Sequence, residues 1–167
     1  MHQDKPTIQR IALVHPKYRD EVTTIYNEAE EALTNYNLRF SYTLRTFQEQ
    51  DLIFQQGRSR PGEIVTWARP GYSYHNYGLA IDICLISPDG KMASWDTKAD
   101  FDKDGISDWM EVVKVFEKYG WEWGVKNKKG ERIDLPHFQK PSGYSTIQLL
   151  DKFKKGDFIP GTKYVNI

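Results

Sequence analysis

The sequence predicts an α+β fold in which helices flank a small antiparallel sheet. Apolar residues recur at helical spacing in some segments, short stretches between them suit strands, and turn-forming residues separate the two kinds. The 167 residues fit one domain of ordinary size. Hydrophobic residues make up 39% of them and include five Trp, ten Tyr and eight Phe, enough for one core. We therefore expect a single domain over residues 1–167.

The first third of the chain is expected to hold a helix, a strand and a short helix. Pro16 is well placed to begin the first helix. Its apolar stripe consists of Val22, Ile25, Tyr26, Ala29, Leu33 and Tyr36. Residues 38–44 alternate apolar and polar side chains, which indicates a half-buried strand. Thr46 and Glu49 then have the spacing of a capping box, and the short helix that they begin ends before Gly57.

The remainder begins with a long loop over residues 57–78, rich in Gly, Pro and Ser. Long loops without secondary structure in compact domains are often functional. Residues 79–87 have the composition of a strand, and residues 108–119 show helical apolar spacing that Gly120 closes. Two further strands and a final helix are expected near residues 121–123, 137–139 and 145–153.

Composition excludes several classes of protein. The 23 basic and 23 acidic residues give a formal net charge of zero, so the chain lacks the basic footprint of a nucleic-acid-binding protein. No stretch approaches the ~18 apolar residues of a membrane span. Cys84 is the single cysteine, so no internal disulfide can form. We expect neither a nucleic-acid partner nor a membrane-spanning segment.

Two of the four histidines are candidate ligands. His2 lies near the terminus and His15 directly precedes Pro16, and we assign both to the surface without a function. His75 and His137 are each flanked by aromatic and turn-forming residues. Taken alone, a histidine in such a setting is more often a structural group than a ligand.

Two aspartates change that weighting. Asp82 lies in the apolar strand between Ile81 and Ile83, where a lone carboxylate is costly unless it is paired or bound to a metal. Two histidines and one carboxylate are a frequent catalytic zinc set, with the fourth position left to water. Asp134 precedes His137 by three residues, and a carboxylate beside a ligand can accept the proton of such a water. The pattern indicates a catalytic zinc site.

These residues lie in two motifs of a known family. The stretch "SYHNYGLAID" matches the Ser-x-His-x-x-Gly-x-Ala-x-Asp motif of the zinc D-alanyl-D-alanine peptidases, and "DLPHFQ" matches their second motif. The sequence most resembles the L-alanyl-D-glutamate peptidase branch of phage endolysins and bacterial autolysins, in which Asp precedes Pro-His. Residues 44–68 and 108–124 also resemble that branch, and the likeness covers roughly residues 38–145.

The resemblance implies a fold of the Hedgehog and D-Ala-D-Ala peptidase type, with a zinc site on the sheet. The implied zinc ligands are His75, Asp82 and His137. Asp134 becomes the general base, and Arg45 polarises the scissile carbonyl and steadies the oxyanion. Without the resemblance we would assign Arg45 to the surface. Ser73 matches the motif serine near the substrate, and Gln50, at a common family position, is counted with it as substrate-binding.

The function implied is zinc-dependent hydrolysis of the L-alanyl-D-glutamate bond in the peptidoglycan stem peptide, by an endolysin or autolysin. One alternative is a D-Ala-D-Ala carboxypeptidase on the same scaffold. Another is a non-catalytic zinc and calcium module that binds the cell wall, against which Asp134 argues, because a structural site needs no base. We expect a monomer that acts on the bacterial cell wall.

The N-terminal residues 1–21 lack the apolar segment of a signal peptide. The chain is therefore expected to stay cytoplasmic until release, as a phage lysin does, or to be a trimmed secreted protein.

The rim of the expected cleft departs from the family. The branch often continues with a second Gly and a Trp, whereas here Trp123 and Gly124 lead into a polar loop over residues 125–134. This difference bears on substrate preference. Tyr74, Tyr77 and Trp123 suit the wall of the cleft and the core equally well.

A second metal site is predicted over residues 100–111, which follow the pattern of a calcium-binding EF-hand loop. Its acidic members are Asp100, Asp102, Asp104, Asp108 and Glu111, at loop positions one, three, five, nine and twelve. Gly105 stands at position six, but Ile106 takes position seven, and no entering helix is evident. The alternative is an acidic helix N-terminus. Some phage endolysins of the branch carry such a loop, so the cofactors expected are Zn²⁺ and, through this loop, Ca²⁺.

Overall fold

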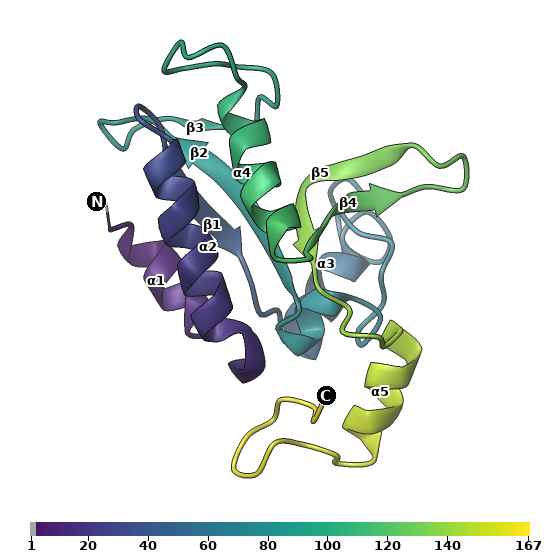
Figure 1. Cartoon of the computed structure of the whole chain (residues 1–167). Helices are drawn as coiled ribbons and strands as arrows, with labels where there is room; N and C mark the ends of the chain where they lie inside the picture. Colours follow the sequence, from purple (N-terminus) through teal and green to yellow (C-terminus); the bar gives the residue numbers. More distant parts are fainter. Residues whose placement is uncertain (1–2) are drawn as a thin grey trace.

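The computed structural model describes residues 3–167 and confirms the α+β class with a small antiparallel sheet (Figure 1). The helices are α1 (Lys5–Ile11), α2 (Arg19–Ala32), α3 (Phe47–Gln55), α4 (Asp108–Lys118) and α5 (Thr146–Lys154), with short 3-10 helices η1 (Pro16–Tyr18) and η2 (Tyr74–Tyr77). The strands are β1 (Asn37–Tyr42), β2 (Ala80–Ile86), β3 (Ala93–Ser94), β4 (Glu122–Lys126) and β5 (Arg132–Gln139). Their order is β1-β2-β5-β4, and β3 pairs with the end of β2.

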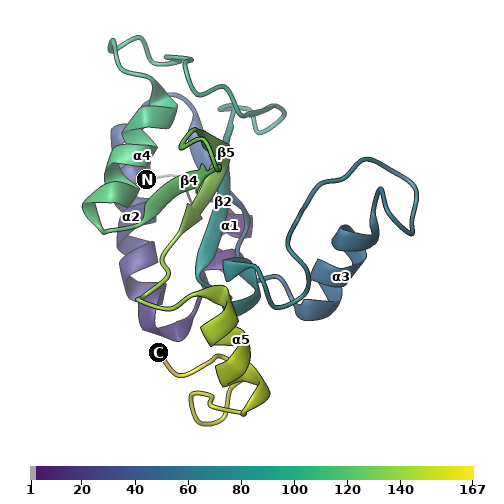
Figure 2. The same cartoon turned by 90° about the vertical axis from the view of Figure 1, so that its right-hand side faces the viewer.

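Helices α2 and α4 cover one face of this sheet, and the core lies between them and the strands (Figure 2). In β2 the side chains of Ile81, Ile83 and Leu85 are fully buried in that core. Because strand side chains alternate, Asp82 points to the other face. Its side chain is 23% exposed, so this carboxylate is not enclosed in the apolar interior as the sequence suggested.

Local signals set several helix boundaries as predicted. Thr46 caps α3, and the reciprocal bonds with Glu49 complete the capping box. Ser145 and Gln148 do the same for α5. The helix predicted from Pro16 begins as η1 and continues as α2, whose apolar stripe is buried.

The structure differs from the prediction along one hairpin. Residues 125–134, predicted as a polar loop, form much of a β4–β5 hairpin with a turn near Gly130. Val125 pairs with Ile133, and Lys126 pairs with Arg132. Most side chains here are exposed, so the pairing leaves no apolar alternation in the sequence. Helix α1 and strand β3 were also not predicted.

The assignment of His15 to the surface was wrong. Its ring is buried, with Nε2 2.8 Å from the carbonyl oxygen of Val165, and Nδ1 accepts the amide hydrogen of Lys17. Burial lowers the pKa of His15. His2 lies outside the described residues.

A long connection between α3 and η2 stands off from the sheet together with α3 (Figure 2). Residues 63–69 of this connection have no regular secondary structure, as the composition suggested. It therefore forms a separate wall beside the open face of the sheet.

Among residues 3–167, no helix has the length and apolar character that crossing a bilayer requires.

Candidate active site

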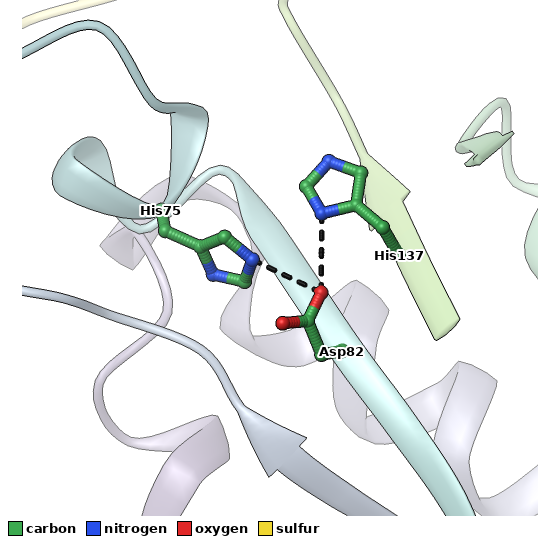
Figure 3. Close-up of side chains that lie close together, drawn as sticks. All are labelled: His75, Asp82 and His137. Carbon is green, nitrogen blue, oxygen red and sulfur yellow. Dashed lines mark hydrogen bonds and ion pairs between the residues drawn. The ribbon is translucent and has the colours of Figure 1, made fainter. Parts of the chain in front are cut away.

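Three elements bring His75, Asp82 and His137 together, as Figure 3 shows. His75 comes from η2, Asp82 from β2, and His137 from β5, where it pairs directly with Asp82 in the sheet. One oxygen of Asp82, Oδ1, lies 3.0 Å from His75 Nε2 and 3.1 Å from His137 Nδ1. We call these three residues the His–Asp–His cluster.

The backbone fixes the orientation of the His75 ring. Its Nδ1 lies 2.6 Å from the carbonyl oxygen of Thr43, which can only accept a hydrogen bond. In neutral His75 the hydrogen is therefore on Nδ1, and the lone pair of Nε2 faces Asp82.

A side-chain relay gives His137 the corresponding orientation. Gln139 donates through Nε2 to Glu122 at 3.0 Å, so its amide oxygen faces Nε2 of His137, at 2.9 Å. The His137 hydrogen is then on Nε2, and the lone pair of Nδ1 faces Asp82.

With both rings neutral, two lone pairs and a carboxylate oxygen converge with no hydrogen between them, an arrangement that a cation at its centre would stabilise. The three ligand atoms lie within 4.8 Å of one another. Their types match the nitrogen and oxygen donors of zinc, and each outer ring nitrogen has the oxygen partner that metal-bound histidines usually have. The cluster fits a metal ion with an open position.

The electrostatics of the cluster also favour a cation. Burial alone would raise the pKa of the Asp82 carboxyl, but its contacts with His137 and His75 hold that pKa far below its usual range. Burial lowers the pKa of His137, yet the contact with Asp82 raises it overall. Asp82 therefore remains an anion that attracts positive charge.

Asp134 lies beside the cluster on an irregular part of β5. Residues 134–137 lie opposite Gly124 alone, because Trp123 pairs with Phe138 and Val125 pairs with Ile133. Such a bulge re-aims side chains at functional sites. Asp134 adopts a left-handed backbone conformation with φ of 56°, and its Oδ2 lies 4.0 Å from His137 Nδ1.

The Asp134 side chain is 56% exposed, so the carboxyl can meet solvent. Partial burial raises its pKa and so does the neighbouring Asp82, whereas His137, His75 and Arg45 lower it. The Asp134 carboxyl lies near the His–Asp–His cluster but is not one of its three members. This position suits a group that exchanges protons.

Arg45 also reaches the cluster. Its Nη2 lies 3.9 Å from Asp82 Oδ2, and its guanidinium lies 4.8 Å from the ring centre of Tyr42. Its backbone amide donates to the carbonyl oxygen of His75 at 2.9 Å. Arg45 is therefore a fixed cation at the edge of the cluster, not the surface residue that its sequence context alone suggested.

Gln50 does not take the substrate-binding position that we predicted. Its side chain is fully buried and accepts a hydrogen bond from Arg45 Nη1 at 3.1 Å. Its own amide donates to the carbonyl oxygen of Ala68 at 2.7 Å and to Thr66 Oγ1 at 3.3 Å. Gln50 thus links Arg45 to the long connection after α3.

The motif serine and glycine shape η2. Ser73 Oγ accepts the backbone hydrogen of His75 at 3.3 Å, and Ser73 also lines the cavity described below. Gly78 ends η2 with φ of 69°, and a Cβ there would lie 2.7 Å from the backbone nitrogen of His15. The motif therefore needs glycine for both conformation and space.

The His–Asp–His cluster, Arg45 and Asp134 line one cavity of about 750 Å³. Residues 65–68 and 72–74 form one wall, and Val125 and Ile133 of the β4–β5 hairpin contribute to another. The three aromatic residues that suited the cleft wall and the core equally well in the sequence take different places in the structure. Tyr74 lines the cavity, whereas Tyr77 is buried in the core and Trp123 packs against it.

The acidic loop forms a separate group of carboxylates before and within the start of α4. Close ligand atoms come from two sets, Asp100 with Asp102 and Asp108, and Asp102 with Asp104 and Glu111. Asp108 is fully buried, and its Oδ2 has no hydrogen-bond partner among residues 3–167; Glu111 Oε2 is likewise buried without one there. Burial and the four aspartates raise the pKa of Glu111 to about 7.

Comparison with known proteins bears on this site. The model of the D-alanyl-D-alanine carboxypeptidase family matches residues 67–140, which hold the whole His–Asp–His cluster and Asp134. The chain resembles this family. The resemblance inferred from the two motifs is thereby confirmed.

A curated relative of this chain is the peptidoglycan L-alanyl-D-glutamate endopeptidase CwlK of Bacillus subtilis (strain 168), which is 48% identical over 95 residues. That match covers 57% of this chain and 55% of the relative, so the chain spans about half the length of the curated relative it matches.

Two solved structures share the fold. The Serratia marcescens L-Ala D-Glu endopeptidase ChiX matches with a TM-score of 0.52 and 21% identity, covering 83% of this chain and 89% of that one. The LdcB LD-carboxypeptidase matches with a TM-score of 0.50 and 21% identity, covering 83% of this chain and 71% of that one. At this identity the likeness establishes the fold alone.

Proposed function

We propose that the chain is a zinc-dependent peptidase that hydrolyses the L-alanyl-D-glutamate bond of the peptidoglycan stem peptide at the bacterial cell wall. The observation that carries this proposal is the convergence of two histidine lone pairs on Asp82, with Asp134 beside them. The choice of bond rests on the 48% identity to an endopeptidase of that specificity.

In the proposed mechanism, His75, Asp82 and His137 hold the metal. Bound zinc supplies a lowered pKa for the attacking water and polarisation of the scissile carbonyl. Asp134 accepts the proton of the water and delivers it to the leaving amine. Arg45 stabilises the negative charge that develops on the carbonyl oxygen, from a position that Gln50 and the His75 backbone hold.

Digestion of purified sacculi tests the reaction, with mass spectrometry of the released fragments. We expect new amino termini on D-glutamate. Release of free D-alanine would indicate the carboxypeptidase alternative, and binding without any release would indicate the non-catalytic module.

Asp134→Asn provides the matched inactive variant. Asparagine tolerates the left-handed backbone at this position, so the fold should persist. We expect zinc content to stay at that of the wild type and the rate to fall by about 10²–10⁴-fold, because proton transfer is lost. A variant that cuts at the wild-type rate would show that another group is the base.

We also propose that the acidic loop binds calcium, with ligands from Asp100, Asp102, Asp104, Asp108 and Glu111. The observation that favours a cation over a plain helix cap is a pair of buried oxygens, on Asp108 and Glu111, that find no hydrogen-bond partner within the described part of the chain. A buried polar atom without a partner costs about 1–3 kcal/mol, and carboxylate oxygens are the ligands that a hard cation such as calcium prefers.

A further inference from the structure

The rim of the active-site cavity carries an unusually exposed tryptophan. The side chain of Trp67 is 81% exposed, and its neighbours Val65 and Ile64 are 59% and 41% exposed. Val65 and Trp67 both line the cavity that holds the His–Asp–His cluster. Single exposed apolar side chains need no explanation, but several in succession on the wall of a cavity indicate a binding surface.

Trp67 is exposed, yet its surroundings hold it in place from behind. The Arg58 guanidinium lies 5.3 Å from the centre of the Trp67 ring and 3.9 Å from that of Phe54. Arg58 Nη2 also donates to the carbonyl oxygen of Thr66 at 3.0 Å. One side of the indole is therefore braced, while most of its surface stays open to the solvent.

The backbone on both sides of Trp67 is anchored as well. Buried Gln50 donates to the side chain of Thr66 and to the carbonyl oxygen of Ala68, the two residues that flank Trp67. The same Gln50 accepts from Arg45. The position of the indole is thus tied to the residue that faces the scissile carbonyl in the proposed mechanism.

The chemistry of the proposed substrate brings a sugar to the cavity that Trp67 and the cluster both line. In peptidoglycan a lactyl group joins the L-alanine of the stem to an amino sugar of the glycan strand. The sugar ring therefore lies about two residue lengths, ~7 Å, from the L-alanyl-D-glutamate bond. A rigid indole offers a broad apolar face for the C–H groups of a sugar ring and an N–H for its polar substituents.

We propose that Trp67 is the platform on which the enzyme packs an amino-sugar ring of the glycan strand next to the scissile stem. This inference rests on the proposed function and adds a sugar subsite to it. The enzyme then prefers stems that are still attached to glycan over free stem peptides.

The test compares kcat/KM for a disaccharide-linked stem peptide and for the same peptide without sugar. In Trp67→Ala we expect the preference for the sugar-linked substrate to fall about threefold to tenfold, the size of a lost aromatic contact. Trp67→Phe should recover part of it. Trp95→Ala removes another exposed tryptophan, one that does not line the cavity, and should leave the preference unchanged.

A second measurement separates this inference from the proposed function. Chitotetraose, a sugar chain without peptide, is titrated into the wild type and into Trp67→Ala. The indole N–H signal of Trp67 is assigned by NMR as the one that Trp67→Ala lacks, and its shift is followed in the wild type. Sugar binding that shifts this signal, and that the variant lacks, supports the platform even if neither peptide is cut. An undisturbed signal, or an equal loss of activity on both peptide substrates, overturns it.

Discussion

At the scale of single residues, hydrogen bonds from neighbouring groups orient the two histidine rings of the site. The carbonyl oxygen of Thr43 fixes the orientation of the His75 ring, and Gln139, held by Glu122, fixes that of the His137 ring. The sequence indicated His75, Asp82 and His137 through their residue types and through the two family motifs in which they lie. These outer partners have no comparable signature in the sequence, since a carbonyl comes from any residue and glutamine is common on surfaces.

The sequence did not indicate that Gln50 holds Arg45 in position, and this role gives a prediction at the scale of single residues. Gln50→Leu keeps most of the buried volume but removes the acceptor for Arg45 and the donor for Ala68. We expect kcat to fall on the order of tenfold, less than the ~10²–10³ for loss of a whole oxyanion donor. Zinc content should not change.

Gln48→Leu is the matched control, because Gln48 lies exposed on the same helix. Steady-state kinetics on one stem-peptide substrate gives kcat and KM for each variant. If Gln50→Leu changes only thermal stability and leaves kcat intact, the amide serves packing and does not position Arg45.

At the scale of elements, the sequence predicts best where burial leaves a periodic pattern. The apolar stripe of α2 and strand β2 followed such patterns. The capping boxes of α3 and α5 could each be recognised from two residues of the sequence. The β4–β5 hairpin was missed because backbone pairing holds it while its side chains stay exposed. This hairpin supplies part of a cavity wall, so the shape of the cleft could not be predicted from the sequence.

The acidic loop provides the element-scale prediction. Calcium that binds the folded chain at a hundred times its dissociation constant adds about 2.7 kcal/mol of stability, or roughly 5–10 °C in Tm. Proton binding to Glu111, whose pKa is about 7 without calcium, competes with the ion. The calcium-induced rise in Tm should therefore be larger at pH 8 than at pH 6.

Asp108→Asn should abolish this rise, because it removes the charge of the buried ligand. Glu117→Gln, on the exposed face of the same helix, should leave the rise intact. Differential scanning calorimetry with calcium or with a chelator measures both. Equal melting temperatures with and without millimolar calcium would identify the loop as an acidic cap of α4.

At the scale of the whole molecule, Glu30 links the helical layer to the sheet. It lies on α2, is 9% exposed, and accepts the backbone hydrogen of Leu38 in β1 at 2.5 Å. Burial raises its pKa to about 7, the Leu38 contact lowers it, and Asp4 raises it. The protonated form is favoured in the folded state, so this group costs stability once the pH rises above about 4.5, the ordinary pKa of the carboxyl.

The sign of the pH dependence follows from these pKa values. Below about pH 4.5 Glu30 is protonated in both the folded and the unfolded state and contributes no penalty. As pH rises to 7 the unfolded state ionises first, and the penalty grows to the order of 3 kcal/mol. Glu30→Gln keeps an acceptor oxygen for Leu38 without the charge, so it should be more stable than the wild type at pH 8 and equal to it near pH 4.5.

Urea unfolding of both proteins from pH 4.5 to 8.5 measures this difference, and contributions common to both, such as that of His15, cancel in the subtraction. Exposed Glu31 gives the matched variant, Glu31→Gln, whose curve should run parallel to that of the wild type. A Glu30→Gln curve that is also parallel would mean that Glu30 is ionised in the folded protein at no cost. The junction of α2 and β1 would then be accessible to water, and it would not act as a closed layer over the sheet that carries Asp82.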